Sequence, residues 1–242
     1  MRQEGKDVGN ATGFFYEYGG RRFLITNRHV VIDEERHHYP DTLSIRVHSN
    51  NMDLTINENV EIPLYNSDRS PLWLEHPKLG REVDVVAVKA DGILKSNHIV
   101  AAINSRNLRP SNVIVGGGED VIIPCYPLGF YDDLHNLPVL RSGMIASPYP
   151  IPFRGQPFFL IDSWLHEGVS GSPVFTKPKS MFRYKDGSTA ITSGELSFFI
   201  GIVSRALPPY EYPAGFEDKR LALYTVYFAE LAEETVAQAG NI

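Results

Sequence analysis

The sequence predicts an all-β protein with a sandwich or barrel architecture. Short segments rich in β-branched and aromatic residues recur along the chain, separated by glycine, proline and asparagine turns. They form two series of about six strands each, on either side of a polar stretch at 103–120. Helical periodicity is weak until the C-terminus. Regular short strands of this kind are typical of sandwiches and barrels.

The first series begins with a hairpin. The segments GFFYEY at 13–18 and RFLITN at 22–27 flank the dipeptide Gly19-Gly20, which favours a tight hairpin turn. Four further strands are expected at 43–48, 54–65, 72–76 and 84–89.

The second series follows the polar stretch, where three consecutive glycines at 116–118 and the pair Arg109-Pro110 indicate loops. Its strands are expected at 121–126, 138–147, 157–162, 172–176, 197–206 and 221–228. The segment AELAEETVAQAG at 229–240 predicts a short terminal helix. We place the boundary between two domains at 106/107, giving units of 1–106 and 107–242.

Composition restricts the partners that we expect. The 242 residues are 43% hydrophobic and 21% charged, as in ordinary globular proteins. The net charge is −6 and no dense Lys/Arg run occurs, so nucleic acid is not an expected partner. The single cysteine, Cys125, cannot form an intramolecular disulfide, and its apolar neighbours predict an inert buried thiol. Cys/His zinc spacing is absent.

Targeting signals are also missing from the sequence. The N-terminal segment has no apolar core typical of a signal peptide, and no apolar run is long enough to span a bilayer. A lone cysteine is compatible with a reducing compartment. We therefore expect a cytoplasmic protein with no membrane partner, although a trimmed chain would look the same.

Three residues have the types and settings that nucleophilic catalysis needs. Ser170 lies in GVSGSP, His29 in FLITNRHVV, and Asp84 opens DVVAVK. A serine hydroxyl is a weak nucleophile, so it needs a base, usually histidine, and the base needs a carboxylate to fix its tautomer. Backbone N–H groups must also point at the developing oxyanion. Each of the three lies where a predicted strand meets a loop.

The order His, Asp, Ser discriminates between the scaffolds that carry this chemistry. The α/β-hydrolases run Ser, Asp/Glu, His, but no histidine follows Ser170, since His166 is the last. Subtilisin-like enzymes run Asp, His, Ser and place a helix after the serine, whereas SPVFT at 172–176 predicts a strand. The chymotrypsin order is the one that remains.

Four segments resemble the trypsin/chymotrypsin-like serine peptidases, specifically the disulfide-free bacterial type near the protease domain of HtrA/Deg proteins. They are GNATGFFYEYGGRRFLITNRHVV, VDVVAVK, EGVSGSPVF and FIGIVSRA, at 9–31, 83–89, 167–175 and 199–206. The resemblance runs from residue 9 to about residue 230. It implies two six-stranded antiparallel barrels, the first carrying the histidine and aspartate and the second the serine, with a short C-terminal helix.

The resemblance also implies a role for each residue. Ser170 is expected to attack the scissile carbonyl. His29 acts as general base and then as general acid, and Asp84 orients it. The backbone N–H groups of Gly168 and Ser170 form the oxyanion hole. Ser204 is expected to hydrogen-bond Asp84 from the wall of the substrate cleft.

By the same resemblance, the segment before the nucleophile, the end of the strand at 197–206 and the strand near 222 form the substrate pocket. The implied substrate-binding residues are Trp164, Ser204, Arg205, Ala206 and Ala222. Asp162 suits a basic substrate side chain, but the pocket-base position falls nearer Trp164, so an apolar or small side chain is expected. His166 fits either the pocket or its rim. The loop at 207–219 is expected to shape the cleft rim.

The sequence departs from the secreted members of this family at Val169. Those enzymes carry an aspartate there, which pairs with a newly cut N-terminus. That activation switch therefore cannot operate through this residue. Either the enzyme is made active, or another trigger orders its oxyanion loop.

The expected function is a serine endopeptidase that hydrolyses peptide bonds through an acyl-enzyme, without metal or cofactor. Its expected partners are peptide or protein substrates, and a regulatory partner is compatible with the sequence. The alternative is a non-catalytic protease-fold module that binds peptides or a partner protein. The pair His37-His38 is a weak metal-binding candidate, because adjacent residues seldom share a ligand face.

Overall fold

The first half of the chain folds into two sheets packed on a shared apolar core. The computed structural model describes residues 1–207 and 221–241. The sheets have the strand orders β2-β1-β5-β6 and β7-β8-β4-β3-β9. Their strands are β1 (Arg2–Gln3), β2 (Lys6–Asp7), β3 (Phe14–Tyr18), β4 (Arg21–Thr26), β5 (Thr42–His48), β6 (Asn57–Pro63), β7 (Trp73–Glu75), β8 (Val86–Lys89) and β9 (Ala102–Ile103).

The hairpin β3–β4 is the centre of the larger sheet. Gly19 and Gly20 both have positive φ, which is why the two-residue turn needs glycine at both positions. Strand β4 has apolar neighbours on both faces: Phe23 and Ile25 pack into one core cluster and Leu24 into another. The one-turn helix α1 (Arg28–Val31) follows β4 directly.

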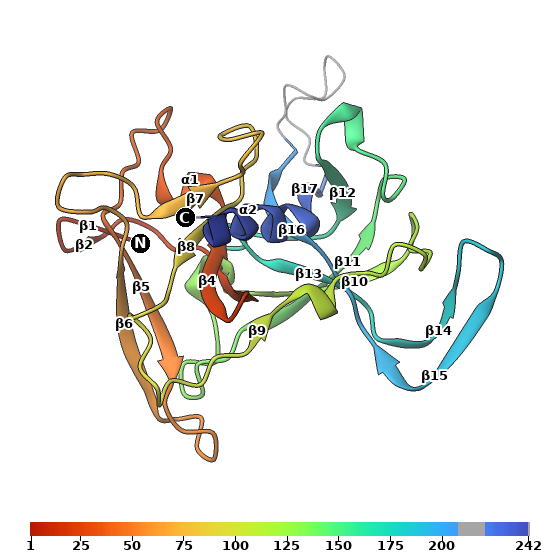
Figure 1. Cartoon of the computed structure of the whole chain (residues 1–242), viewed down its shortest axis with the longest axis horizontal. Helices are drawn as coiled ribbons and strands as arrows, with labels where there is room; N and C mark the ends of the chain where they lie inside the picture. The colour runs from red at the N-terminus through yellow and green to blue at the C-terminus, as the bar shows by residue number, and fades with distance from the viewer. Residues whose placement is uncertain (208–220, 242) are drawn as a thin grey trace.

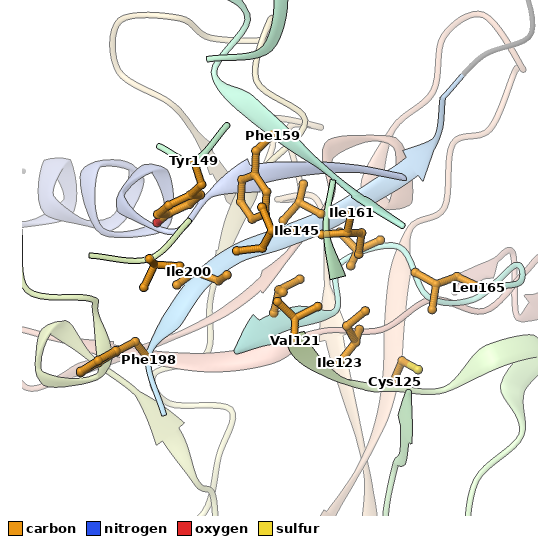
Figure 2. Close-up of a cluster of buried hydrophobic side chains, with 14 of the residues drawn as sticks. Val121, Ile123, Cys125, Ile145, Tyr149, Phe159, Ile161, Leu165, Phe198 and Ile200 are labelled. Carbon is orange, nitrogen blue, oxygen red and sulfur yellow. The ribbon is translucent and has the colours of Figure 1, made fainter. Parts of the chain in front are cut away.

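The second half forms a closed barrel with the strand order β10-β11-β12-β17-β16-β13. Its strands are β10 (Asp120–Cys125), β11 (Val139–Ile145), β12 (Phe158–Asp162), β13 (Pro173–Thr176), β16 (Phe199–Ala206) and β17 (Leu223–Phe228). Inward-facing side chains from these strands fill the barrel, including Ile123, Ile145, Phe159 and Ile161 (Figure 2). The alternation of buried and partly exposed residues along β10 is that of a strand with one face on a core.

A second hairpin, β14 (Lys179–Arg183) and β15 (Thr189–Leu196), forms a separate two-stranded sheet. Figure 1 shows it extending away from the rest of the molecule. Phe182, close to the turn of the hairpin, is buried in the barrel core. Backbone hydrogen bonds from Ile114 to Arg183 and from Lys185 to Asn112, both 2.9 Å, join the turn end of the hairpin to the connection before β10. The sequence reading did not predict this hairpin, because its strands are largely polar and lack an alternating apolar pattern.

The terminal helix α2 (Glu230–Ala237) joins the two halves. It contacts β3, β7 and β8 of the first half and β17 of the barrel, near the middle of the molecule (Figure 1). Leu231, Ala232 and Val236 are buried in a cluster that includes residues of both halves. The hydroxyl of Tyr16 donates a hydrogen bond to Glu233 at 2.7 Å.

Short 3₁₀ turns complete the described structure: η1 (Ser105–Asn107), η2 (Pro127–Gly129), η3 (Phe153–Gly155) and η5 (Gln238–Asn241). In the described part of the chain, no helix has the length and apolar character needed to cross a membrane.

The all-β class and the terminal helix predicted from the sequence are confirmed, and the twelve predicted strands are present with small shifts at their ends. The second half is the closed six-stranded barrel that was expected, whereas the strands of the first half are hydrogen-bonded as separate four- and five-stranded sheets. These sheets also contain two short strands at the N-terminus, and β9 in parallel pairing with β3, which the sequence did not predict. The boundary at 106/107 lies in the connection between β9 and β10 and stays a prediction.

Candidate active site

The turn that carries His29 is fixed on both sides. Asn27, fully buried between β4 and α1, donates a side-chain hydrogen bond to the Asp84 carbonyl oxygen at 2.6 Å. On the other side, the guanidinium of Arg28 bonds Glu75 at 2.9 Å and Glu34 at 2.7 and 2.8 Å. These contacts set the position of the imidazole before any substrate is present.

The Asp84 carboxylate binds His29 through two atoms. It accepts from the ring Nδ1 at 2.7 Å and from the His29 backbone N–H at 3.0 Å. An ionised carboxylate can only accept, so Nδ1 carries the proton and the neutral ring keeps Nε2 as an acceptor. The side chain of Asp84 is 8% exposed and that of His29 is 22% exposed, so the ring is the part of the pair that solvent or substrate reaches.

Asp84 is held in its ionised form. Burial raises the pKa of its carboxyl group. The hydrogen bond from His29, the positive charge of that ring when it is protonated, and the hydroxyl of Ser204 lower the pKa by more, so that it lies below the usual range. The carboxylate is therefore charged near neutral pH, as the orientation of a histidine base requires.

Ser204 lies at a bulge in β16. The pairing with β17 shifts register between Val203 and Ala206, where two residues face one residue of the partner strand. The Ser204 hydroxyl donates to Asp84 Oδ2 at 2.6 Å, as the sequence predicted. The bulge thus aims this side chain at the carboxylate and leaves the Ser204 carbonyl on the opposite side for another donor.

That donor is Ser170. Its hydroxyl donates to the Ser204 carbonyl oxygen at 2.9 Å. His29, Asp84, Ser204 and Ser170 are therefore connected by hydrogen bonds, although the first two come from the first half of the chain and the others from the barrel. Within the described residues, Ser170 Oγ is hydrogen-bonded to this carbonyl and not to His29.

The turn at 167–170, which we call the oxyanion turn, has all four of its carbonyl groups occupied. Glu167 O accepts from the Leu128 N–H at 2.6 Å, and Val169 O accepts from the N–H and hydroxyl of Ser172 at 3.0 and 2.5 Å. The remaining two carbonyls bond to Thr12. In a planar trans peptide the N–H points opposite to the carbonyl of the preceding residue. The N–H groups of Gly168 and Ser170 therefore point away from the bonded carbonyls of Glu167 and Val169.

The two N–H groups have no acceptor in the part of the chain that the structure describes. Two donors left free on one turn, beside a serine hydroxyl, form a site suited to a negatively charged oxygen.

Two glycines are required here, one inside the oxyanion turn and one directly after it. Gly168 has φ +90°, and a Cβ there would lie 2.6 Å from the Tyr126 carbonyl oxygen and 2.9 Å from the Leu128 nitrogen. Gly171 has φ +85°, and a Cβ there would lie 2.1 Å from the Thr12 carbonyl oxygen. Both positions combine a left-handed backbone with the close approach of another segment, which only glycine tolerates.

The comparison with known families agrees with this geometry. A family model described as a trypsin-like peptidase domain matches residues 11–180. The chain belongs to the trypsin-like peptidase family. The matched range contains His29, Asp84 and Ser170 together with the oxyanion turn. A search of curated proteins finds no match.

Solved structures of serine-protease fold resemble this trypsin-like peptidase over most of its length. An inactive mutant form of Rv3671c from M. tuberculosis H37Rv is 14% identical, with a TM-score of 0.50, covering 97% of this chain and 83% of its own. Human heparin binding protein is 12% identical, with a TM-score of 0.50, covering 95% of this chain and 85% of its own. At these identities the likeness shows the fold alone. The narrower resemblance to HtrA/Deg proteins stays a prediction.

Three of the residues predicted to bind substrate in this trypsin-like peptidase lie at the end of β16 and just before β17. Arg205 and Ala206 are exposed at the end of β16, and the Arg205 guanidinium is 3.8 Å from Asp84 Oδ2. Ala222 has a positive φ, and its carbonyl accepts from the Ser163 N–H at 3.0 Å. The predicted rim loop at 207–219 lies outside the described residues, apart from Leu207.

Trp164 and Asp162 do not line a buried pocket base. The ring of Trp164 is 63% exposed, its carbonyl accepts from Arg141, and its nearest aromatic neighbour is His166 on the same exposed segment. Asp162 lines a separate surface hollow with Asp120. The structure therefore brings the predicted triad together but leaves these two side chains at the surface.

Sequence reasoning missed Thr12, Tyr126 and Leu128, which hold the oxyanion turn from outside it. The segment YPLG at 126–129 does contain a turn signal, since Pro127 precedes Leu128-Gly129, and both of the latter have positive φ. Nothing in the sequence distinguishes Thr12 from any other threonine that leads into a strand. Within the described residues, no group of His, Cys, Asp or Glu is arranged to hold a metal ion.

Proposed function

We propose that this protein is a serine endopeptidase that cleaves peptide bonds in protein or peptide substrates through His29, Asp84 and Ser170. One observation carries the proposal: hydrogen bonds run from His29 through Asp84 and Ser204 to Ser170, beside two N–H groups with no acceptor in the described structure. A base, a carboxylate, a nucleophile and anion-binding donors are the groups that acyl transfer needs.

The acylation step begins with a change of partner for Ser170. Rotation about its Cα–Cβ bond moves the hydroxyl from the Ser204 carbonyl towards Nε2 of His29, a change between staggered rotamers. Nε2 takes the proton as Ser170 Oγ attacks the scissile carbonyl, and the oxyanion is stabilised by the N–H groups of Gly168 and Ser170. His29 then donates the proton to the leaving amine, leaving an acyl-enzyme. Water reverses these roles and releases the second product.

The substrate backbone would bind along the end of β16. The strand pairing of β13 with β16 stops at Ile202. Val203 is the last residue of β16 whose backbone bonds to the segment after Ser170, through Gly171 and Ser172. Beyond this point Arg205 and Ala206 are exposed. An extended peptide could add to this edge as a strand, and a substrate N–H that takes the Ser204 carbonyl would release the Ser170 hydroxyl for attack.

The side-chain preference follows from what lines the site. Asp162 lies in a separate surface hollow, so it supplies no carboxylate for a basic side chain. The side chains next to the turn and within it add no charge either, since Leu165, Val169 and Val203 are apolar and buried in the barrel core. We therefore propose apolar or small residues before the scissile bond. A cytoplasmic location and a regulatory partner stay predictions.

The proposal is tested by profiling cleavage of a diverse peptide mixture by the wild type and by Ser170→Ala. Cleavage by the wild type alone, after a consistent set of residues, is the expected result. If neither protein cleaves any peptide while both are folded, the endopeptidase proposal is wrong. Binding of peptides without turnover would then favour the non-catalytic module.

A further inference from the structure

We propose that Thr12 is a positioning residue that holds the oxyanion turn in its anion-binding conformation, so that no activation trigger is needed. This inference rests on the proposed function. It concerns a residue from the lead-in to β3, separated from the nucleophile by most of the chain, whose side chain and backbone both bond to the turn.

Thr12 contacts the oxyanion turn through two donors. Its hydroxyl donates to the Gly168 carbonyl oxygen at 2.8 Å, and its backbone N–H donates to the Ser170 carbonyl oxygen at 2.9 Å. The same hydroxyl oxygen accepts from the Tyr126 N–H at 3.1 Å. One buried side chain, 3% exposed, therefore joins the turn to the loop that follows β10.

These bonds act where the turn is otherwise free to change. Gly168 has no Cβ, so its backbone could adopt several conformations, and only some of them direct its N–H towards a substrate. With its carbonyl bonded to Thr12 and the preceding carbonyl bonded to Leu128, both peptide groups flanking Gly168 are fixed in orientation.

Thr12 is itself held in place. Its carbonyl oxygen accepts from the Thr26 hydroxyl at 2.9 Å, at the end of β4 and one residue before the turn that leads to His29. Because Gly171 has no Cβ, the Thr12 carbonyl can also approach the backbone directly after Ser170 closely. The positions of the base and of the oxyanion turn are thereby tied to one segment of the first half.

This arrangement also gives Val169 a structural role. Its side chain is buried in the barrel core, where an ion pair with a new N-terminus has no place. In our proposal, the hydrogen bonds from Thr12 and Leu128 order the oxyanion turn in place of such an ion pair, and they need no cut N-terminus and no second protein. The purified chain alone should then cleave substrate without a lag.

The test compares Thr12→Val with Thr12→Ser. Valine keeps the shape of the side chain but removes the hydroxyl. We expect kcat to fall about 10- to 100-fold with little change in KM, because removing a whole oxyanion donor typically lowers kcat about 100- to 1000-fold. Serine keeps the hydroxyl and should restore most of the rate. A peptide aldehyde, whose adduct places an oxyanion in the hole, should lose affinity for Thr12→Val by a similar factor.

The matched control is Thr235→Val. Thr235 is fully buried, and its hydroxyl donates to the Leu231 carbonyl within α2, away from the site. If Thr12→Val loses no more kcat or aldehyde affinity than this control, the inference is wrong. If Thr12→Val does not fold, Thr12→Ala against Thr12→Ser makes the same comparison. A wild type that is inactive when purified but becomes active in a cell lysate would also contradict the inference. A wild type that is inactive in both would overturn the proposed function instead, so the two failures can be told apart.

Discussion

The Ser170 hydroxyl donates to the carbonyl of Ser204 at 2.9 Å, while the hydroxyl of the same Ser204 donates to Asp84 at 2.6 Å. Ser204 thus contacts both the proposed nucleophile and the carboxylate that orients the proposed base. In this state the nucleophile is bonded to the strand that we expect to bind substrate. Binding of a substrate N–H to that carbonyl would therefore couple substrate recognition to release of the nucleophile.

Ser204→Ala should weaken the site without dismantling it. The change keeps the carbonyl and removes a hydrogen bond to a buried carboxylate, which typically contributes about 1.5–3 kcal/mol. We expect the free energy of unfolding at neutral pH to fall by about that amount and the pKa of Asp84 to rise. Urea unfolding measures the first effect. Ser197→Ala, which removes a bond to a neutral carbonyl at 2.6 Å, is the control, and equal losses in the two variants would contradict the account.

Asp84→Asn should abolish most activity while the fold persists. The amide can present a donor to His29 and so favour the wrong ring tautomer, which in enzymes with this triad costs on the order of 10⁴-fold in kcat. Steady-state kinetics at neutral pH measure the effect, with circular dichroism to verify folding. Activity within tenfold of the wild type would mean that Asp84 does not orient the base.

The ion pair between Arg28 and Glu34 should be lost in acid. The hydrogen bond from Arg28 lowers the pKa of Glu34 from its ordinary 4.5 to about 2. Since the pKa of Glu34 is lower in the folded state, its contribution is present above about pH 4.5 and is lost as the pH falls towards 2. Glu34 is about half exposed, so solvent screening limits the contribution to about 1 kcal/mol or less.

The contribution of this ion pair is measured as the difference in the free energy of unfolding in urea between the wild type and Glu34→Gln, at neutral pH and near pH 2. The variant should be less stable at neutral pH, and the difference should vanish in acid. A difference that persists unchanged near pH 2 would show that the charge of Glu34 is not its source.

Cys125 should be unreactive in the native protein. It is completely buried, and burial raises the pKa of its thiol to about 11. A thiol reagent at neutral pH should therefore label it slowly in buffer and rapidly in denaturant, because the thiolate is the reacting form. Complete labelling of the native protein within minutes would indicate that the barrel core opens readily.

Much of the fold could be predicted because its strands carry local signals. The hairpin at Gly19-Gly20 and the apolar run of β4 are visible in the sequence, and the order of His29, Asp84 and Ser170 selects one scaffold. Hairpin β14–β15 was missed because its polar strands have no apolar face, and the sheets of the first half differ from a closed barrel through pairings that leave no local pattern.

Two features of the site could not be predicted for a different reason. The bond between Thr12 and Gly168 joins residues 156 positions apart, so no local spacing reports it. The rotamer of Ser170 depends on the competing acceptor at Ser204, which the bulge in β16 exposes. Both depend on how the two halves meet, and a sequence motif specifies residue types without specifying that contact.

The most direct test of the central claim is labelling with a fluorophosphonate at neutral pH, followed by mapping of the modified residue. A fluorophosphonate reacts with a serine activated by a base and an oxyanion hole, so we predict one label, on Ser170, and none on Ser170→Ala. Asp84→Asn should label far more slowly than the wild type. A folded wild type that stays unlabelled, or a label on another residue, would contradict the account.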